Sequence, residues 1–97
     1  MACYTIGHIT VHNMEGYKEY AAKVPATIAA HGGKYLVRGG DCKDIEGEMP
    51  HDRHVVLEFP TREALEGWYY SPEYQEILKI RLANSTGIMT TVDGFEG

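Results

Sequence analysis

Apolar and polar residues alternate along four short stretches of this chain, and apolar residues recur at helical spacing along two longer ones. The alternating stretches are rich in β-branched and aromatic residues, which predicts β-strands at residues 4–11, 34–38, 53–59 and 87–93. We expect the second strand to run on toward Cys42 past two glycines. Residues 43–52 are polar and contain glycine and proline, so they predict a hairpin loop between the second and third strands.

Residues 14–31 carry apolar side chains three and four positions apart, which predicts an amphipathic helix. Asn13 can cap its N-terminus, and Gly32-Gly33 supplies a left-handed C-terminal stop. Pro25 lies inside the pattern and has no backbone N–H. We therefore expect a kink or a fresh helical start at Pro25.

A second helical region follows Pro60. Thr61 is a capping residue, and the apolar positions after it keep helical spacing. Ser71-Pro72-Glu73 is a second start signal, with a cap, a proline at the first helical position and an acid in the first turn. This pattern predicts a second helix broken into two parts.

The predicted order is β-α-β-β-α-β, which is the ferredoxin-like arrangement of the α+β class. We expect one domain across residues 1–97, with a four-stranded antiparallel sheet and the strands at 4–11 and 53–59 in its centre. Both helices would cover one face. The other face would carry Tyr4, Ile6 and Val56, or their alternates, and is too apolar to remain exposed. We predict a homodimer in which two such sheet faces pack together.

The composition is that of an ordinary globular domain, with 43% hydrophobic and 24% charged residues. The net charge of −5 argues against a nucleic-acid partner. Cys3 and Cys42 show no zinc-binding or redox spacing, which predicts reduced thiols in a cytoplasmic protein. No apolar run is long enough to span a membrane, so we predict no membrane partner.

Metal and cofactor motifs do not emerge from the sequence. Of the five histidines, His51 and His54 flank a loop–strand junction and are the one pair considered for a divalent ion. The chain has no P-loop and no GxGxxG, and its two serines lack a nucleophile-elbow context. We therefore predict no metal and no cofactor.

Strand alternation indicates which polar side chains share a face of the sheet. The predicted even-numbered face holds His8, Arg38, His54 and Glu58. Arg38 and Glu58 would lie on neighbouring strands. In one interpretation Arg38 binds a carboxylate, and Glu58 or His8 accepts a proton. In the other, Arg38 and Glu58 form an ion pair that orders the subunit or the dimer.

Aromatic residues of the second helical region form another candidate cluster. Trp68 and Tyr74 fit core positions that hold the broken helix against the sheet. Alternatively, Tyr69 and Tyr74 direct hydroxyl groups into a cleft between the helices and the sheet. Arg81 would close that cleft, or would donate to the C-terminal carbonyls of its own helix.

Several separated motifs together resemble one family. They are Tyr35-Leu36-Val37-Arg38-Gly39-Gly40, Leu57-Glu58-Phe59-Pro60, Trp68-Tyr69, Ser71, Glu73-Tyr74-Gln75 and Arg81. In this order they are similar to the DUF-1330 family of small bacterial-type proteins. The resemblance implies a dimeric α/β-barrel assembly and assigns no activity. Residues 94–97 lie outside it and are expected to form a loose tail.

The wider group includes cofactor-free monooxygenases, muconolactone-type isomerases and haem-degrading enzymes. The chain has no histidine beyond His54, which argues against a haem-degrading mechanism. Three hypotheses stay open. The leading one is a dimer that binds a small apolar and anionic organic molecule, such as an organic acid, in a cleft of each subunit. The second is a cofactor-independent oxygenase or isomerase, and the third is a structural or regulatory dimer. Whether the protein is an enzyme is undecided at this level.

Overall fold

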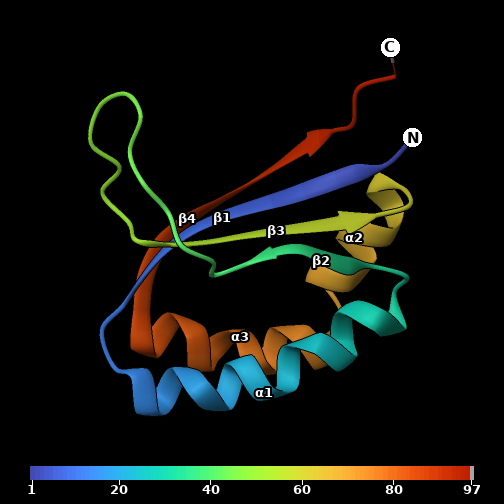
Figure 1. The fold of residues 1–97 in the computed structure, drawn as a ribbon. Helices are drawn as coiled ribbons and strands as arrows, with labels where there is room; N and C mark the ends of the chain where they lie inside the picture. The colour runs from blue at the N-terminus through green and yellow to red at the C-terminus, as the bar shows by residue number, and fades with distance from the viewer. Residues whose placement is uncertain (97) are drawn as a thin grey trace.

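The chain folds into four strands and three helices, in a computed structural model that describes residues 1–96. The elements are β1 (Cys3–Val11), α1 (Met14–Ala30), β2 (Lys34–Arg38), β3 (Arg53–Phe59), α2 (Arg62–Tyr69), α3 (Pro72–Asn84) and β4 (Ser85–Asp93) (Figure 1). The strands form one antiparallel sheet in the order β2-β3-β1-β4. The predicted ferredoxin-like α+β fold, with β1 and β3 in the centre, is confirmed.

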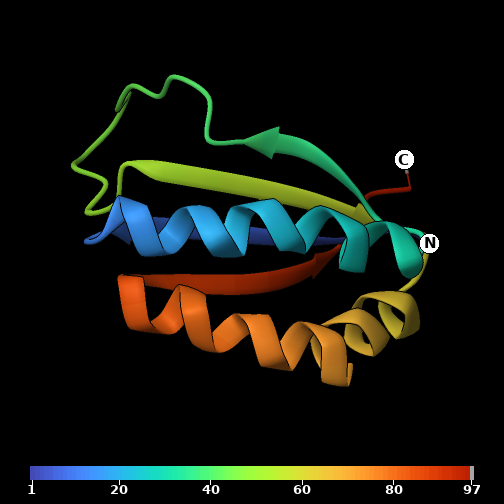
Figure 2. The same cartoon turned by 90° about the horizontal axis from the view of Figure 1, so that it is seen from below.

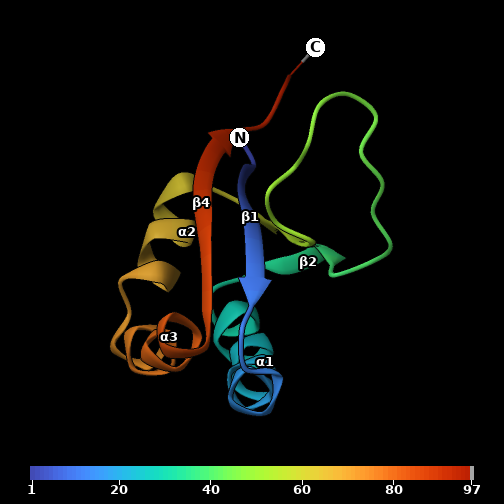
Figure 3. The ribbon, with the colours of Figure 1, turned by 90° about the vertical axis from the view of Figure 1, so that its left-hand side faces the viewer.

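The helices form a second layer against one face of the sheet. Figure 2 shows α1 and α3 lying side by side, with α2 next to the N-terminal end of α3. The predicted capping residues begin the three helices. Asn13 accepts from the Gly16 N–H, Thr61 accepts from Ala64, and Ser71 accepts from Tyr74. The long loop between β2 and β3 stands away from the helices (Figures 1 and 3).

The core lies between the helices and the odd-numbered residues of β1 and β3. Its largest fully buried side chains are Trp68, Tyr74, Phe59, Ile9 and Ile28. The Trp68 indole N–H donates to the Thr27 hydroxyl at 3.0 Å, so the buried tryptophan is also satisfied as a donor. Trp68 and Tyr74 thus occupy the core positions that their spacing allows.

A β-bulge in β2 changes which face its side chains occupy. Tyr35 lies opposite Leu57, whereas Val37 lies opposite Val56, so one extra residue stands between them. Because one residue of slippage reverses every later side chain, Arg38 turns to the helix-covered face. The predicted placement of Arg38 beside Glu58 is therefore wrong.

The bulge leaves Lys34, not Arg38, opposite Glu58. Their charged groups lie 3.8 Å apart on an exposed part of the sheet. The expectation that β2 continues toward Cys42 is also wrong. The strand ends at Arg38, and Gly39 follows with φ +68°, a left-handed conformation that favours glycine and turns the chain out of the sheet.

Helix α1 continues through Pro25 as one helix, so the alternative of a fresh start there is wrong. Proline has no N–H to donate to the carbonyl four residues earlier. That carbonyl belongs to Ala21, which is therefore available to a donor from outside the helix. At the other end of the chain, β4 begins at Ser85, two residues before the predicted strand.

None of the helices described within residues 1–96 covers the second face of the sheet. Its side chains are the even-numbered residues of β1 and β3 together with alternate residues of β4. Apolar members of this face, which we call the open face, are Ile6, Val37, Val56, Ile88 and Val92. Ile88 is 62% exposed and Val92 is 46% exposed. The isolated subunit therefore presents apolar surface across its sheet.

The ends of the chain lie near each other beside β1 and β4 (Figure 1). The Gly94 N–H donates to the Ala2 carbonyl at 2.8 Å. The expected loose tail ends at residue 97, which lies outside the described residues. No helix within residues 1–96 has the length and apolar character needed to cross a membrane.

Candidate functional site

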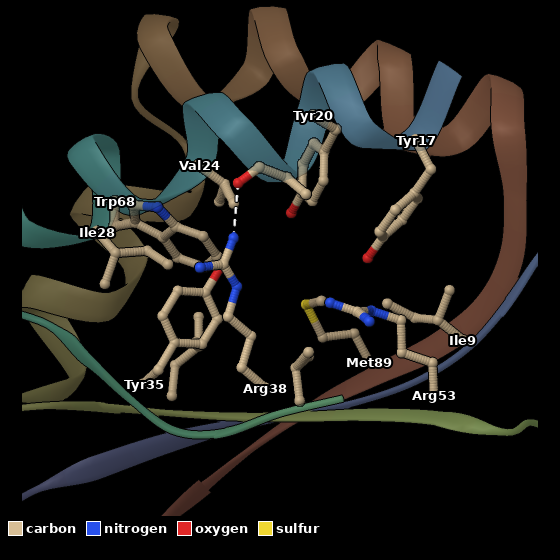
Figure 4. A pocket seen from close by; sticks show the side chains of 13 residues that line it. Ile9, Tyr17, Tyr20, Val24, Ile28, Tyr35, Arg38, Arg53, Trp68 and Met89 are labelled. Atoms are coloured by element: carbon tan, nitrogen blue, oxygen red, sulfur yellow. Dashed lines mark hydrogen bonds between the residues drawn. The ribbon is translucent and has the colours of Figure 1, made fainter. Parts of the chain in front are cut away.

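A small cavity lies between α1 and the sheet, and its wall combines tyrosines with two arginines. Its enclosed volume is about 20 Å³. Polar and aromatic members of the lining are Tyr17, Tyr20, Tyr35, Arg38, Arg53 and Trp68 (Figure 4). We call it the arginine–tyrosine cavity. The tyrosines at 17 and 20 descend from α1, whereas Tyr35 and both arginines rise from β2 and β3.

Arg53 is the first residue of β3 and shares the helix-covered face with Val55. Its guanidinium lies over the Tyr17 ring, 5.3 Å from the centroid. Its Nε is buried and has no hydrogen-bond partner within residues 1–96. Arg53 is not among the residues that the sequence pattern singled out, although its odd-numbered alternation with Val55 on the same strand is a signal for this face.

Arg38 reaches across the cavity from the sheet to α1. Its guanidinium lies 4.8 Å from the centroid of the Tyr35 ring, and Nη2 donates to the Ala21 carbonyl at 2.6 Å (Figure 4). The Ala21 carbonyl is free because Pro25, four residues later, has no N–H to offer it. The proline within α1 therefore creates the acceptor that holds Arg38.

The cavity has a positive electrostatic character. No Asp or Glu among the described residues lines it. Among residues 1–96, the ion pairs involve Lys23, Lys34, Arg62 and Lys79 and none involves Arg38 or Arg53. Burial raises the pKa of Tyr35, while the nearby charges of Arg38 and Arg53 act in the opposite direction. Two guanidinium groups thus face one tyrosine-lined space without a carboxylate.

Tyr20, which lines the cavity, also meets two buried polar residues of α3, Tyr74 and Arg81. The Tyr20 and Tyr74 hydroxyl oxygens are 2.9 Å apart. Arg81 is only 7% exposed, and its guanidinium lies 6.0 Å from the Tyr20 ring centroid. Burial raises the pKa of Tyr74, and the nearby charge of Arg81 acts in the opposite direction. Arg81 was predicted to close a cleft or to donate to the C-terminal carbonyls of its own helix, and within residues 1–96 its buried Nε has no hydrogen-bond partner.

A second, wider groove of about 440 Å³ lies between α2 and β4. Tyr69 and Tyr70 line it, and the buried Thr5 hydroxyl at its base has no hydrogen-bond partner within residues 1–96. Arg62 at its rim donates to Asp93 and Thr91. Met89 lines both this groove and the arginine–tyrosine cavity.

Glu58 and His8, the candidate proton acceptors, lie on the open face and not at the cavity. Glu58 lies opposite Tyr4, and its charge is the main cause that raises the pKa of that tyrosine. His8 and His54 are cross-strand partners whose Nδ1 atoms are 2.8 Å apart. No group of three or more potential metal ligands occurs within residues 1–96.

The structure therefore divides the candidate residues among several places. Of His8, Arg38, Glu58, Tyr69, Tyr74 and Arg81, only Arg38 lines the arginine–tyrosine cavity, and only Tyr69 lines the groove. Tyr74 connects to the cavity indirectly, through its hydrogen bond with the Tyr20 hydroxyl, and Arg81 lies near the ring of the same tyrosine. Neither space is lined by two of these six residues, although catalysis by them would need at least two in one cleft.

The fold and the cavity define a ferredoxin-like α+β protein with an arginine-rich, tyrosine-lined space between helix and sheet. The chain belongs to the DUF1330 family, a domain of unknown function whose model matches residues 2–95. The predicted family is confirmed. No curated protein matches the sequence.

Solved structures share the fold at low sequence identity. The RPA0582 protein of unknown function from Rhodopseudomonas palustris has a TM-score of 0.83 and 16% identity, covering 99% of this chain and 84% of that one. A dimeric ferredoxin-like protein of unknown function from Jannaschia sp. CCS1 has a TM-score of 0.74 and 14% identity, covering 97% and 100%. SnoaB, a cofactor-independent oxygenase from Streptomyces nogalater, has a TM-score of 0.65 and 15% identity, covering 99% and 95%.

Proposed function

We propose that the protein is a cytoplasmic homodimer that binds a small organic acid with an apolar body, one molecule per subunit, in the arginine–tyrosine cavity. One observation carries this proposal: Arg38 and Arg53 face the same tyrosine-lined space, and no carboxylate of residues 1–96 pairs with either. Both cysteines are free, which fits a reducing compartment.

A carboxylate suits both the charge and the hydrogen-bonding needs of the cavity. A buried donor without a partner costs about 1–3 kcal/mol, and the Arg53 Nε is such a donor. The planar guanidinium fork matches a carboxylate with two parallel hydrogen bonds. Around this charged end, Val24, Ile28 and Trp68 provide apolar surface for the remainder of a ligand.

The cavity must open to admit such a ligand, since about 20 Å³ holds about one water molecule. Arg38 is exposed, and a hydrogen bond ties it to the Ala21 carbonyl. A carboxylate that replaced this carbonyl as the partner of Arg38 would let the side chain swing outward. Met89 lines both spaces, and movement of its flexible side chain would join the cavity to the larger groove.

A thermal-shift screen of small organic acids tests the binding proposal. An acid at 100 times its dissociation constant should add about 2.7 kcal/mol to the free energy of unfolding. Arg53→Met should keep the fold and lose most of this stabilisation. Arg62→Met is the matched control, because Arg62 pairs with Asp93 away from the cavity. The proposal fails if no acid raises the melting temperature, or if Arg62→Met abolishes the effect as fully as Arg53→Met.

The dimer rests on the open face. Its apolar residues lie in the centre of the sheet as well as on β4, and a second copy would supply a matching apolar surface. The similar Jannaschia protein is described as dimeric, which supports the same assembly here. Sedimentation at micromolar concentration should give a dimer. A stable monomer there would overturn this part of the proposal.

A cofactor-independent oxygenase is the second candidate function, favoured by the likeness to SnoaB across nearly the whole chain. The candidate base Glu58 and the alternative His8 stand on the open face, so this reaction would have to rely on cavity residues instead. Oxygen uptake with any acid found in the screen separates a binding protein from an enzyme. A structural dimer, the third hypothesis, predicts neither binding nor turnover.

A further inference from the structure

The arginine–tyrosine cavity is too small for the acid that its arginines would attract, whereas the neighbouring groove is large enough. The cavity encloses about 20 Å³, which holds about one water molecule, and the groove between α2 and β4 measures about 440 Å³. Pockets that bind small molecules usually measure about 300–1,000 Å³. The groove therefore has room for the body of a ligand that the cavity cannot enclose.

Met89 of β4 separates the two spaces. Figure 4 shows the end of its side chain in the arginine–tyrosine cavity, pointing toward Arg53, and the same residue lines the groove. Gly7 lies opposite Met89 on β1, and a Cβ added there would lie 3.3 Å from the Met89 Cε. Gly7 thus leaves room for the end of this side chain. Methionine is unbranched and flexible, so Met89 can move aside while its strand stays in place.

The charges along the groove favour one direction for a bound acid. Arg62 is already paired with Asp93, 3.0 Å away. Glu66 also lines the groove, and it joins none of the ion pairs described within residues 1–96. A second carboxylate in the groove would be repelled by Glu66 and would find the arginine taken. The carboxylate of a ligand is therefore favoured at Arg38 and Arg53, and an uncharged part of the molecule suits the groove.

The lining of the groove suits an aromatic ring. The Tyr69 and Tyr70 rings lie 5.1 Å apart and nearly perpendicular, and Leu65 adds apolar surface beside them. Tyr70 is 71% exposed, so a ligand can cover its ring. The buried Thr5 hydroxyl has no hydrogen-bond partner within residues 1–96, and a polar atom on a bound molecule would supply one.

We propose that the ligand is an acid with an aromatic ring at its far end, and that Met89 moves aside to let this ring lie in the groove while the carboxylate meets Arg38 and Arg53. This inference rests on the proposed function and specifies the ligand class. Met89 is then the residue that determines specificity. A short aliphatic acid needs only the arginines, whereas an aryl acid also needs the passage that Met89 closes.

The test compares butyrate with 4-phenylbutyrate, which share a carboxylate and an aliphatic chain and differ by one ring. Burial of the ring should make 4-phenylbutyrate bind about 10- to 100-fold more tightly by calorimetric titration. Met89→Trp fills the passage with a rigid side chain, so it should bring the two dissociation constants close together. Met49→Trp is the matched control and should keep their ratio, because Met49 lies in the loop between β2 and β3 and lines neither space.

Tyr70→Ala removes an exposed ring from the groove and should lower the ratio about 2- to 10-fold. It decides the matter if Met89→Trp does not fold. Equal affinities of the two acids for the parent protein, or a ratio that is unchanged in the variant that decides, would overturn the inference and leave carboxylate binding at the arginines standing. Binding of neither acid to the parent protein would overturn both proposals.

Discussion

Three arginine side chains of this protein have no acidic partner among the described residues. Arg38, Arg53 and Arg81 make none of the ion pairs described within residues 1–96, and all three lie near tyrosines on the helix-covered side of the sheet. Arg81 is buried and Arg53 is half-buried, and buried arginines are normally paired. The lack of an acidic partner for these two within the described residues, with the exposed Arg38 beside them, supports the proposed anion site.

Gly39 leaves room for the Arg53 guanidinium and offers a matched pair of substitutions. A Cβ at Gly39 would collide with the Arg53 guanidinium, and φ at Gly39 is +68°. Gly47 has φ +72° and nothing within 4 Å of its Cβ position. Each change to alanine should cost about 1 kcal/mol through backbone strain. Only Gly39→Ala should also weaken acid binding, measured by calorimetry. Equal losses of binding in both variants would contradict the role assigned to Arg53.

Tyr20 and Tyr74 predict a loss of stability in alkali. Their pKa values are raised by burial, so the folded protein holds protons that the unfolded chain releases above about pH 10. Stability contributed by these groups is complete below that pH and declines as pH rises toward the folded-state pKa values. The slope is about 1.4 kcal/mol per pH unit for each such tyrosine. Urea unfolding across this range should show a shallower decline in Tyr20→Phe. An unchanged slope would contradict the raised pKa.

Two local irregularities in the secondary-structure elements shape the arginine–tyrosine cavity. The bulge in β2 turns Arg38 toward the helices, and Pro25 leaves the Ala21 carbonyl of α1 unpaired at the point that Arg38 reaches. Neither irregularity interrupts its own element, since α1 runs through Pro25 and β2 is one strand. Together they place a guanidinium across the mouth of the cavity and give it an acceptor when no ligand is present.

Pro25→Ala should therefore strengthen acid binding. An alanine N–H at this position would take the Ala21 carbonyl into the helix and release Arg38. Loss of one competing hydrogen bond worth about 1 kcal/mol corresponds to a roughly fivefold tighter dissociation constant. Calorimetric titration with an acid from the screen measures it. The double variant Pro25→Ala with Arg38→Met should show no gain, and a gain that survives there would contradict the mechanism.

The complete fold separates two surfaces with different roles. The helix-covered face of the sheet holds the arginine–tyrosine cavity, and the open face holds apolar residues together with the His8–His54 pair. If two copies pack through their open faces, the cavities remain on the outer sides of the sheets. Dimer formation and ligand binding can then be altered independently.

Val56→Glu should dissociate the dimer without unfolding the subunit. Val56 lies on the open face of the central strand β3, where a carboxylate would lose water in an apolar interface. Leu82→Glu makes the same kind of change on α3, at a side chain that is 62% exposed. Sedimentation should give a monomer for the first variant and a dimer for the second. A dimeric Val56→Glu protein would place the interface elsewhere.

Local patterns along the chain were enough to establish the elements and their order. Asn13, Thr61 and Ser71 begin helices where their side chains can accept from the following turn, and alternation of apolar residues marks the strands. These signals depend on neighbours a few residues apart. The ferredoxin-like topology follows from them because few arrangements of four strands and two helical regions cover a sheet.

The site depended on contacts between residues far apart in the chain. Which face Arg38 occupies depends on a bulge whose extra residue is visible only in the register with β3, and alternation alone placed Arg38 beside Glu58. Arg53 enters the site because Gly39 leaves room for it, and Tyr20 of α1 meets Tyr74 and Arg81 of α3 across two packed helices. Spacing along a sequence predicts periodicity, whereas the partners of a buried charge are chosen by three-dimensional packing.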